Sequence, residues 1–107
     1  MTTPKNVTHH TIYLDPNRSH CVNQVVVKQL GNGEVVAVFN EERFPYHHDT
    51  GQTVLMRSRD GGCTWGDRQV ILPYTPTLGN WDCGIVELAG GELLVNLTMC
   101  AFFKRGV

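Results

Sequence analysis

The loop at residues 41–52 gathers the side chains of this chain that are most able to do chemistry. It reads Glu-Glu-Arg-Phe-Pro-Tyr-His-His-Asp-Thr-Gly-Gln and so combines carboxylates, imidazoles, a guanidinium and aromatic rings. The segments on either side are β-rich, and the loop is long for a connection between two strands. Long loops of mixed character on a rigid scaffold are where binding and catalytic residues gather. We therefore place the candidate site in this loop.

A metal site is one interpretation of this loop, because His47, His48 and Asp49 carry ligand types that transition metals accept. Adjacent residues of an extended chain point to opposite sides, however, and no further ligand follows at a zinc-like spacing. The cysteines also lack a C-x-x-C pair. We predict neither a metal nor a cofactor, and interpret these histidines as solvated loop residues.

The elements that position the loop form an internal repeat. The segment Leu30–Phe39 (LGNGEVVAVF) recurs at residues 88–97 (LAGGELLVNL), an offset of 58 residues. Each copy has apolar segments on both sides of a Gly-containing turn, which is typical of a β-hairpin. The sequence thus predicts an all-β chain without a helix, in which four antiparallel strands form one unit and two more begin the next. The predicted strands lie near residues 22–30, 34–40, 53–58, 68–73, 84–88 and 92–98.

The same offset maps Asn23 and Gln24 onto Trp81 and Asp82, at the entrance of each unit's first strand. An aromatic side chain beside a carboxylate is a common way to hold a sugar ring, through stacking and hydrogen bonds to hydroxyls. The alternative is that Trp81 packs between units and Asp82 caps a turn. His20 precedes the first strand on the same face, and either donates a hydrogen bond to a ligand or is satisfied within a turn.

A turn motif follows the third predicted strand. Residues 58–65 read Ser-Arg-Asp-Gly-Gly-Cys-Thr-Trp and match the pattern S-x-D-x-G-x-T-W. Its carboxylate can accept hydrogen bonds from backbone amides one or two residues further on, its glycines allow positive φ, and its Thr can add a bond to the backbone. The Trp then returns the chain to the core. We predict that the motif closes a hairpin and does no chemistry; its pattern residues are Ser58, Asp60, Gly62, Thr64 and Trp65.

This octapeptide resembles the Asp-box repeats of sialidases and sialidase-like β-propellers. The resemblance implies a six-bladed propeller of four-stranded antiparallel blades, and at about 40–50 residues per blade the chain supplies about two. It further implies an N-terminal arm at 1–20, a first blade at 21–74 and the start of a second blade at 75–107. We accordingly expect an N-terminal fragment whose partner is the rest of its own propeller.

The resemblance extends to the candidate loop. Residues 37–43 (AVFNEER) followed by Asp49-x-Gly are similar to the sialidase segment that leads through a Glu-x-Arg element to a catalytic Asp. By this match Asp49 is the acid/base that protonates the leaving glycosidic oxygen, and a Tyr nucleophile is expected downstream. Arg43 is then a substrate-binding residue, or it pairs with Glu42 to shape the loop. Where the family places the first Arg of its carboxylate-binding cluster, this chain has Asn23.

The function implied is that of a sialidase-like glycoside hydrolase acting on glycans. The alternative is a non-catalytic carbohydrate-binding or protein-interaction propeller, which Asn23 favours. The chain has nine Lys and Arg against ten Asp and Glu, and its basic residues form no cluster that would bind nucleic acid. The start of the sequence does not resemble a signal peptide and no apolar run is of membrane-spanning length, so we expect no membrane partner and, by default, a cytoplasmic location. Without an Arg cluster or an assignable Tyr nucleophile, the chain alone should release no sialic acid.

Overall fold

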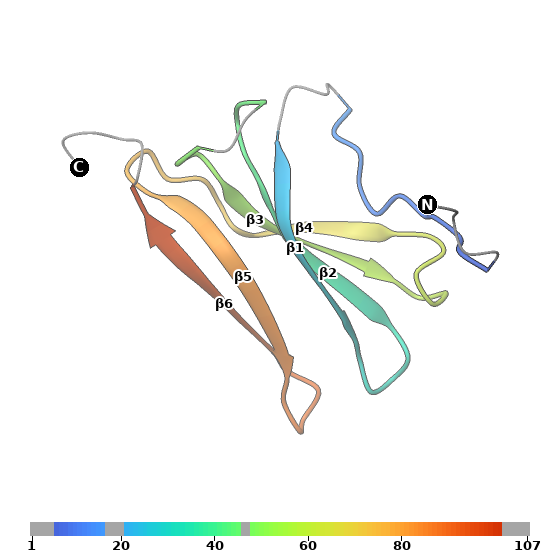
Figure 1. Cartoon of the computed structure of the whole chain (residues 1–107). Coiled ribbons are helices and arrows are strands. Elements are labelled where there is room, and N and C mark those ends of the chain that lie inside the picture. The colour runs from blue at the N-terminus through green and yellow to red at the C-terminus, as the bar shows by residue number, and fades with distance from the viewer. Residues whose placement is uncertain (1–5, 17–20, 46–47, 102–107) are drawn as a thin grey trace.

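The computed structural model describes residues 6–16, 21–45 and 48–101, which form two antiparallel sheets (Figure 1). Within these residues there is no helix, and so none that is long and apolar enough to cross a membrane. Each of the six predicted strand segments overlaps one observed strand, and the all-β prediction is confirmed. The strands are β1 (Val22–Gln29), β2 (Val35–Glu41), β3 (Gln52–Ser58), β4 (Gly66–Leu72), β5 (Gly79–Glu87) and β6 (Leu93–Cys100).

The first sheet is a meander in the order β1-β2-β3-β4, and β5 pairs with β6 in a separate hairpin. The central strands β2 and β3 are almost entirely buried, which explains why their sequences read as continuous apolar runs rather than as alternating patterns. The predicted boundary between residues 74 and 75 falls in the connection from β4 to β5.

Side chains from β2 and β3 point alternately to two faces of the first sheet. The front face carries Val38 and Leu55, and the β5–β6 hairpin packs against it. The back face carries Phe39 and Val54, and the N-terminal segment packs there through Tyr13, whose ring stacks on that of Phe39 with 5.5 Å between centroids. The cores on both faces are therefore built on the same two strands.

The internal repeat extends to backbone conformation. The pairing of β1 with β2 shifts register between Asn23 and Val26, and that of β5 with β6 shifts between Trp81 and Gly84. Each bulge contains a residue in the left-handed region, with φ of 53° at Gln24 and 51° at Asp82. This conformation is uncommon for residues other than glycine, and its recurrence at the 58-residue offset shows that the two hairpins have equivalent bulges.

The prediction that β5 begins near residue 84 is wrong, because the strand starts at Gly79 and continues through its bulge. A bulge inserts an unpaired residue and interrupts the apolar alternation by which a strand is recognised. The predicted starts of the other strands differ from the observed ones by at most two residues.

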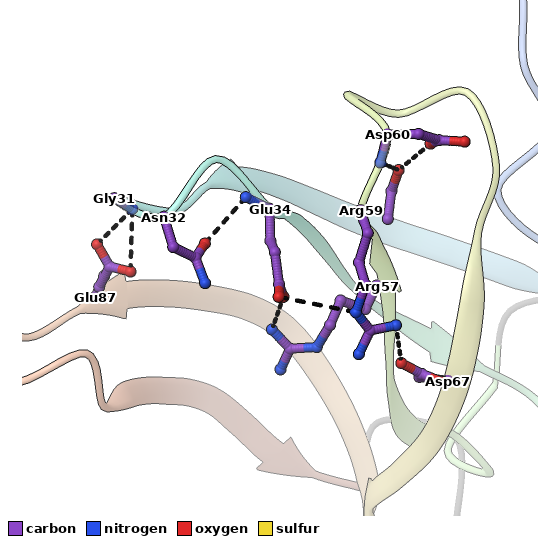
Figure 2. A network of polar contacts seen from close by, with 9 residues as sticks. Gly31, Asn32, Glu34, Arg57, Arg59, Asp60, Asp67 and Glu87 are labelled. Atoms are coloured by element: carbon purple, nitrogen blue, oxygen red, sulfur yellow. Dashed lines mark hydrogen bonds and ion pairs between the residues drawn. The ribbon is translucent and has the colours of Figure 1, made fainter.

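The turns of the first sheet lie at two ends. Glu34, next to the β1–β2 turn, pairs with Arg57 at 2.7 Å and with Arg59 at 3.8 Å, beside the turn of residues 58–65 (Figure 2). These two turns therefore share one end of the sheet; we call it the Asp-box end. The start of β1, the connection from β2 to β3 and the start of β5 lie toward the top of Figure 1, and we call this the loop end.

Candidate functional site

The turn of residues 58–65 closes the β3–β4 hairpin through hydrogen bonds among its own side chains. Asp60 Oδ1 accepts from the Thr64 amide at 2.8 Å and from the Ser58 hydroxyl at 2.8 Å, and Asp60 Oδ2 accepts from the Thr64 hydroxyl at 2.5 Å. Ser58 Oγ in turn accepts from the Gly62 amide at 2.9 Å. All three polar side chains of the motif thus bind within the turn.

The bonds differ in detail from the prediction. Asp60 caps an amide four residues further on, rather than one or two, because Gly61 and Gly62 take φ of 74° and 97° and lengthen the turn. The Thr64 hydroxyl donates to the carboxylate instead of to the backbone. These bonds, first those from Thr64 and then that from Ser58, lower the pKa of Asp60 to about 2.

Trp65 anchors the turn to the body of the sheet. Its indole nitrogen donates to the Gly62 carbonyl at 2.9 Å, and its ring packs on the back-face cluster that contains Phe39 and Val54. The motif therefore holds the hairpin closed, and its carboxylate is engaged at the end of the sheet opposite to the candidate loop.

At the loop end, Asp49 is fully buried against the start of β5. A Cβ atom placed on Gly79 would lie 2.6 Å from Asp49 Cα and 3.0 Å from Trp81 Nε1, and only glycine allows so close an approach. The carbonyl of Asn80 lies 2.9 Å from where a Cβ on Gly51 would be. Backbone packing between the loop and β5 thus brings Asp49 and Trp81 to one place.

Glu42 and Thr50 fix the shape of the loop. The Thr50 amide and hydroxyl donate to Glu42 Oε2 at 3.3 and 3.2 Å, and the Arg43 amide donates to Thr50 Oγ1 at 3.1 Å. Glu42 is 1% exposed and Thr50 is 4% exposed. The Arg43 guanidinium lies 3.8 Å from the centroid of the Tyr74 ring, an aromatic contact that had not been predicted.

A polar network connects the two bulges. Gln24 Nε2 donates to Asp82 Oδ1 at 2.8 Å, and the Asp82 amide donates to Gln24 Oε1 at 3.1 Å. Asn40, which is fully buried, donates to the same Gln24 oxygen at 2.5 Å and accepts from the Cys83 thiol at 3.1 Å. The network thus holds the exposed carboxylate of Asp82 between β1 and β5, the first strand of each unit.

Sequence reasoning missed Gln24 and Asn40 as members of this network. The available signals were the repeat offset, which pairs Gln24 with Asp82, and the presence of an amide at position 40, at the end of an apolar strand. Asn23, which had been predicted to bind the substrate, is half-buried and donates to Cys21 Sγ at 3.4 Å.

Burial first, and then the carboxylates of Asp49 and Asp82, raise the pKa of the Cys100 thiol above its usual value. Cys100 pairs with Gly79 across the β5–β6 hairpin, so both acids lie near this end of it. The raised pKa makes the Cys100 thiol a poorer nucleophile than an ordinary cysteine.

Two predicted histidines, His20 and His47, lie outside the described residues. Among the residues that are described, no three His, Cys, Asp or Glu side chains come together as a metal site. Comparisons of the chain with protein-family models, with curated proteins and with solved structures gave no match. The function of the chain is therefore inferred from its own residues.

Proposed function

We propose that this chain forms one blade and the inner hairpin of the next in a sialidase-like β-propeller that acts on glycans. The observation that carries the proposal is the coincidence of two features. A turn with the Asp-box pattern closes one end of a four-stranded meander, and the repeat-related residues Gln24 and Asp82 meet at the other end, on the side of Asp49. The resemblance associates the first feature with the propeller fold, and the second places a carboxylate, Asp82, next in sequence to an aromatic residue, Trp81, a combination that commonly holds a sugar ring.

Further support comes from an apolar groove between the front face of the first sheet and β6. It has a volume of about 450 Å³, and its apolar lining includes Leu55, Ile71 and Val95. In a propeller of four-stranded blades, the outer strand pair of the second blade would cover such a groove. The rest of the ring would be supplied by further blades.

The residues at the loop end favour a neutral sugar as the ligand. Asn23 is uncharged where the family has an Arg, and the exposed carboxylate of Asp82 would repel an acidic sugar. The same carboxylate can accept hydrogen bonds from hydroxyl groups, and Trp81, which is half-buried near Gly79, would offer the exposed part of its ring for stacking. We therefore expect neutral glycans to bind more tightly than sialylated ones.

Binding is tested by calorimetric titration of neutral and sialylated oligosaccharides into the wild-type chain and the Asp82→Asn variant. Loss of a hydrogen bond to a charged group weakens binding by about 1.5–3 kcal/mol, which is roughly tenfold or more. The matched control is Asp67→Asn, because Asp67 also has a positive φ, 52°, but lies at the Asp-box end near Arg59. Equal affinity in both variants would remove Asp82 from the proposed pocket.

The second candidate function is a binding propeller without catalysis, and the burial of Asp49 favours it. An acid/base must reach the leaving oxygen within hydrogen-bond distance, and Asp49 is 0% exposed. The two candidates are separated by turnover of a panel of aryl glycosides by the wild-type protein and by Asp49→Asn. The assay uses the complete propeller, because the chain alone has no assignable Tyr nucleophile. Turnover that Asp49→Asn abolishes supports a hydrolase, whereas glycan binding by the complete propeller without turnover supports the binding module.

A further inference from the structure

The β5–β6 hairpin has an apolar face that points away from the first sheet. Ile85 and Val95, a directly paired couple, pack on the front face of the first sheet. The next pair along the ladder, Val86 and Leu94, therefore points the opposite way, and these side chains are 51% and 57% exposed. We call Val86 and Leu94 the hairpin front.

The first sheet has an uncovered apolar patch on its back face. Val27 pairs with Ala37 and so lies on the side opposite to Val38. Val25 and Val27 are 54% and 51% exposed, because Tyr13 and its neighbours cover the back face over Phe39 but not over this part of β1. We call Val25 and Val27 the β1 back patch; beside it lies a cavity of about 150 Å³.

The repeat makes the β1 back patch the counterpart of a surface that is already packed in this molecule. The 58-residue offset maps Val27 onto Ile85. Ile85 packs on the front face of the first sheet, whereas Val27 has no such cover. By the same offset, exposed Leu94 corresponds to Val36, which is fully buried. The two exposed surfaces are thus equivalent to the two sides of the contact between the first sheet and the hairpin.

The contact between the first sheet and the hairpin includes a polar contact that an equivalent pair of residues could also make between the two exposed surfaces. Glu87 accepts from the Gly31 amide at 2.9 and 3.2 Å, which ties the hairpin to the β1–β2 turn (Figure 2). The offset maps Gln29 onto Glu87 and Ala89 onto Gly31, so the Gln29 side-chain oxygen of a following unit would meet the Ala89 amide. An amide oxygen accepts this bond as a carboxylate does, although without the charge.

We propose that copies of this chain associate head to tail, with the β1 back patch of one copy packed on the hairpin front of another. The contact repeats the one between the first sheet and the β5–β6 hairpin, and is continuous with it. Because the two surfaces differ, the contact is heterologous. An open assembly therefore has a free β1 back patch at one end and a free hairpin front at the other, until a ring closes. A net charge of −1 opposes this association only weakly. The inference depends on the repeat and not on glycan binding. A monomeric chain that binds neutral glycans would refute this contact alone, and an associating chain that binds no glycan would refute the glycan site alone.

Complementation between two variants tests the proposal. Leu94→Lys disables the hairpin front and Val27→Lys disables the β1 back patch, and both side chains are about half exposed, so the fold tolerates the changes. In sedimentation equilibrium each variant alone should show a Kd raised by about tenfold or more over wild type. An equimolar mixture should recover a wild-type contact and stop at the heterodimer. Val7→Lys, an exposed residue on neither surface, should associate as wild type does.

Two results would overturn the head-to-tail contact. One is a wild-type chain that stays monomeric at about 1 mM. The other is association that persists in both variants, as pairing through the free edge of β6 would produce. Circular dichroism checks that each variant is folded, and hydrogen exchange at the Ala89 amide gives a second measurement. Protection there should rise with chain concentration and be lost in Gln29→Ala; protection independent of concentration would contradict the proposal.

Discussion

The close approach of the candidate loop to β5 predicts that Gly79→Ala will be among the more damaging single changes in the chain. The new Cβ would lie 2.6 Å from Asp49 Cα and 2.8 Å from Asp49 C. Carbon atoms in ordinary contact are about 3.5–4.0 Å apart, so the overlap is about 1 Å and falls on backbone that no rotamer change can move. The loop must shift away from β5.

Overpacking of this kind typically costs about 1–3 kcal/mol, and we expect the upper half of that range because backbone is displaced. Gly90→Ala is the matched control, since a Cβ there meets nothing within 4 Å. Both changes lower the entropy of the unfolded chain alike, so the difference between the two variants isolates the clash.

Urea unfolding followed by circular dichroism measures this difference, with unchanged m-values as the check that both variants unfold in the same way. Hydrogen exchange at the Thr50 amide reports the loop directly, because this amide donates to Glu42 Oε2 at 3.3 Å in the native packing. Stabilities of Gly79→Ala and Gly90→Ala within about 0.5 kcal/mol of each other would refute the tight packing of Asp49 on β5.

Three further predictions concern the polar contacts of the first sheet. Thr64→Val removes the hydroxyl that donates to Asp60, so NMR titration should show the pKa of Asp60 rising from about 2 toward 3.8, while Thr64→Ser should keep it low. Since folding lowers this pKa, the contribution of Asp60 to stability should be complete above pH 3.8 and be lost as the pH falls toward 2, which urea midpoints across that range will measure. Burial alone would raise the pKa of Glu41, but its hydrogen bonds, including that from Arg68 at 2.8 Å, outweigh burial and lower it. Arg68→Gln should therefore raise the pKa of Glu41 and destabilise the fold by about 1–3 kcal/mol at neutral pH; an unchanged urea midpoint would show that the pair contributes nothing.

The strands were predictable because apolar runs and glycine turns are local signals. The hairpin at Leu30–Phe39 and its copy at residues 88–97 have the same pattern, and both form as expected. The turn of residues 58–65 was equally predictable as a closure, since its short polar side chains and glycines can satisfy one another without outside partners.

The bulges and the loop packing were not predictable in the same way. Gln24 has no intrinsic preference for the left-handed region, so its φ of 53° depends on contacts with Asn40 and Asp82, distant in sequence. The burial of Asp49 likewise depends on Gly79, a residue of the next hairpin that contributes nothing to the local pattern of the loop. Contacts between segments distant in sequence decide these features, and the local sequence around each residue does not contain them.

The central claim, that the loop end binds glycans and the Asp-box end does not, is tested most directly by fluorescence. The chain has two tryptophans, Trp65 in the turn of residues 58–65 and Trp81 at the loop end. Trp65→Phe leaves Trp81 as the sole indole reporter, and Trp81→Phe leaves Trp65. We predict that a neutral oligosaccharide changes the emission of the Trp65→Phe variant in a saturable way and leaves that of Trp81→Phe unaltered. A saturable change in the emission of Trp81→Phe alone would contradict the account. Unchanged emission in both variants, with no binding of neutral or sialylated glycans, would also contradict it.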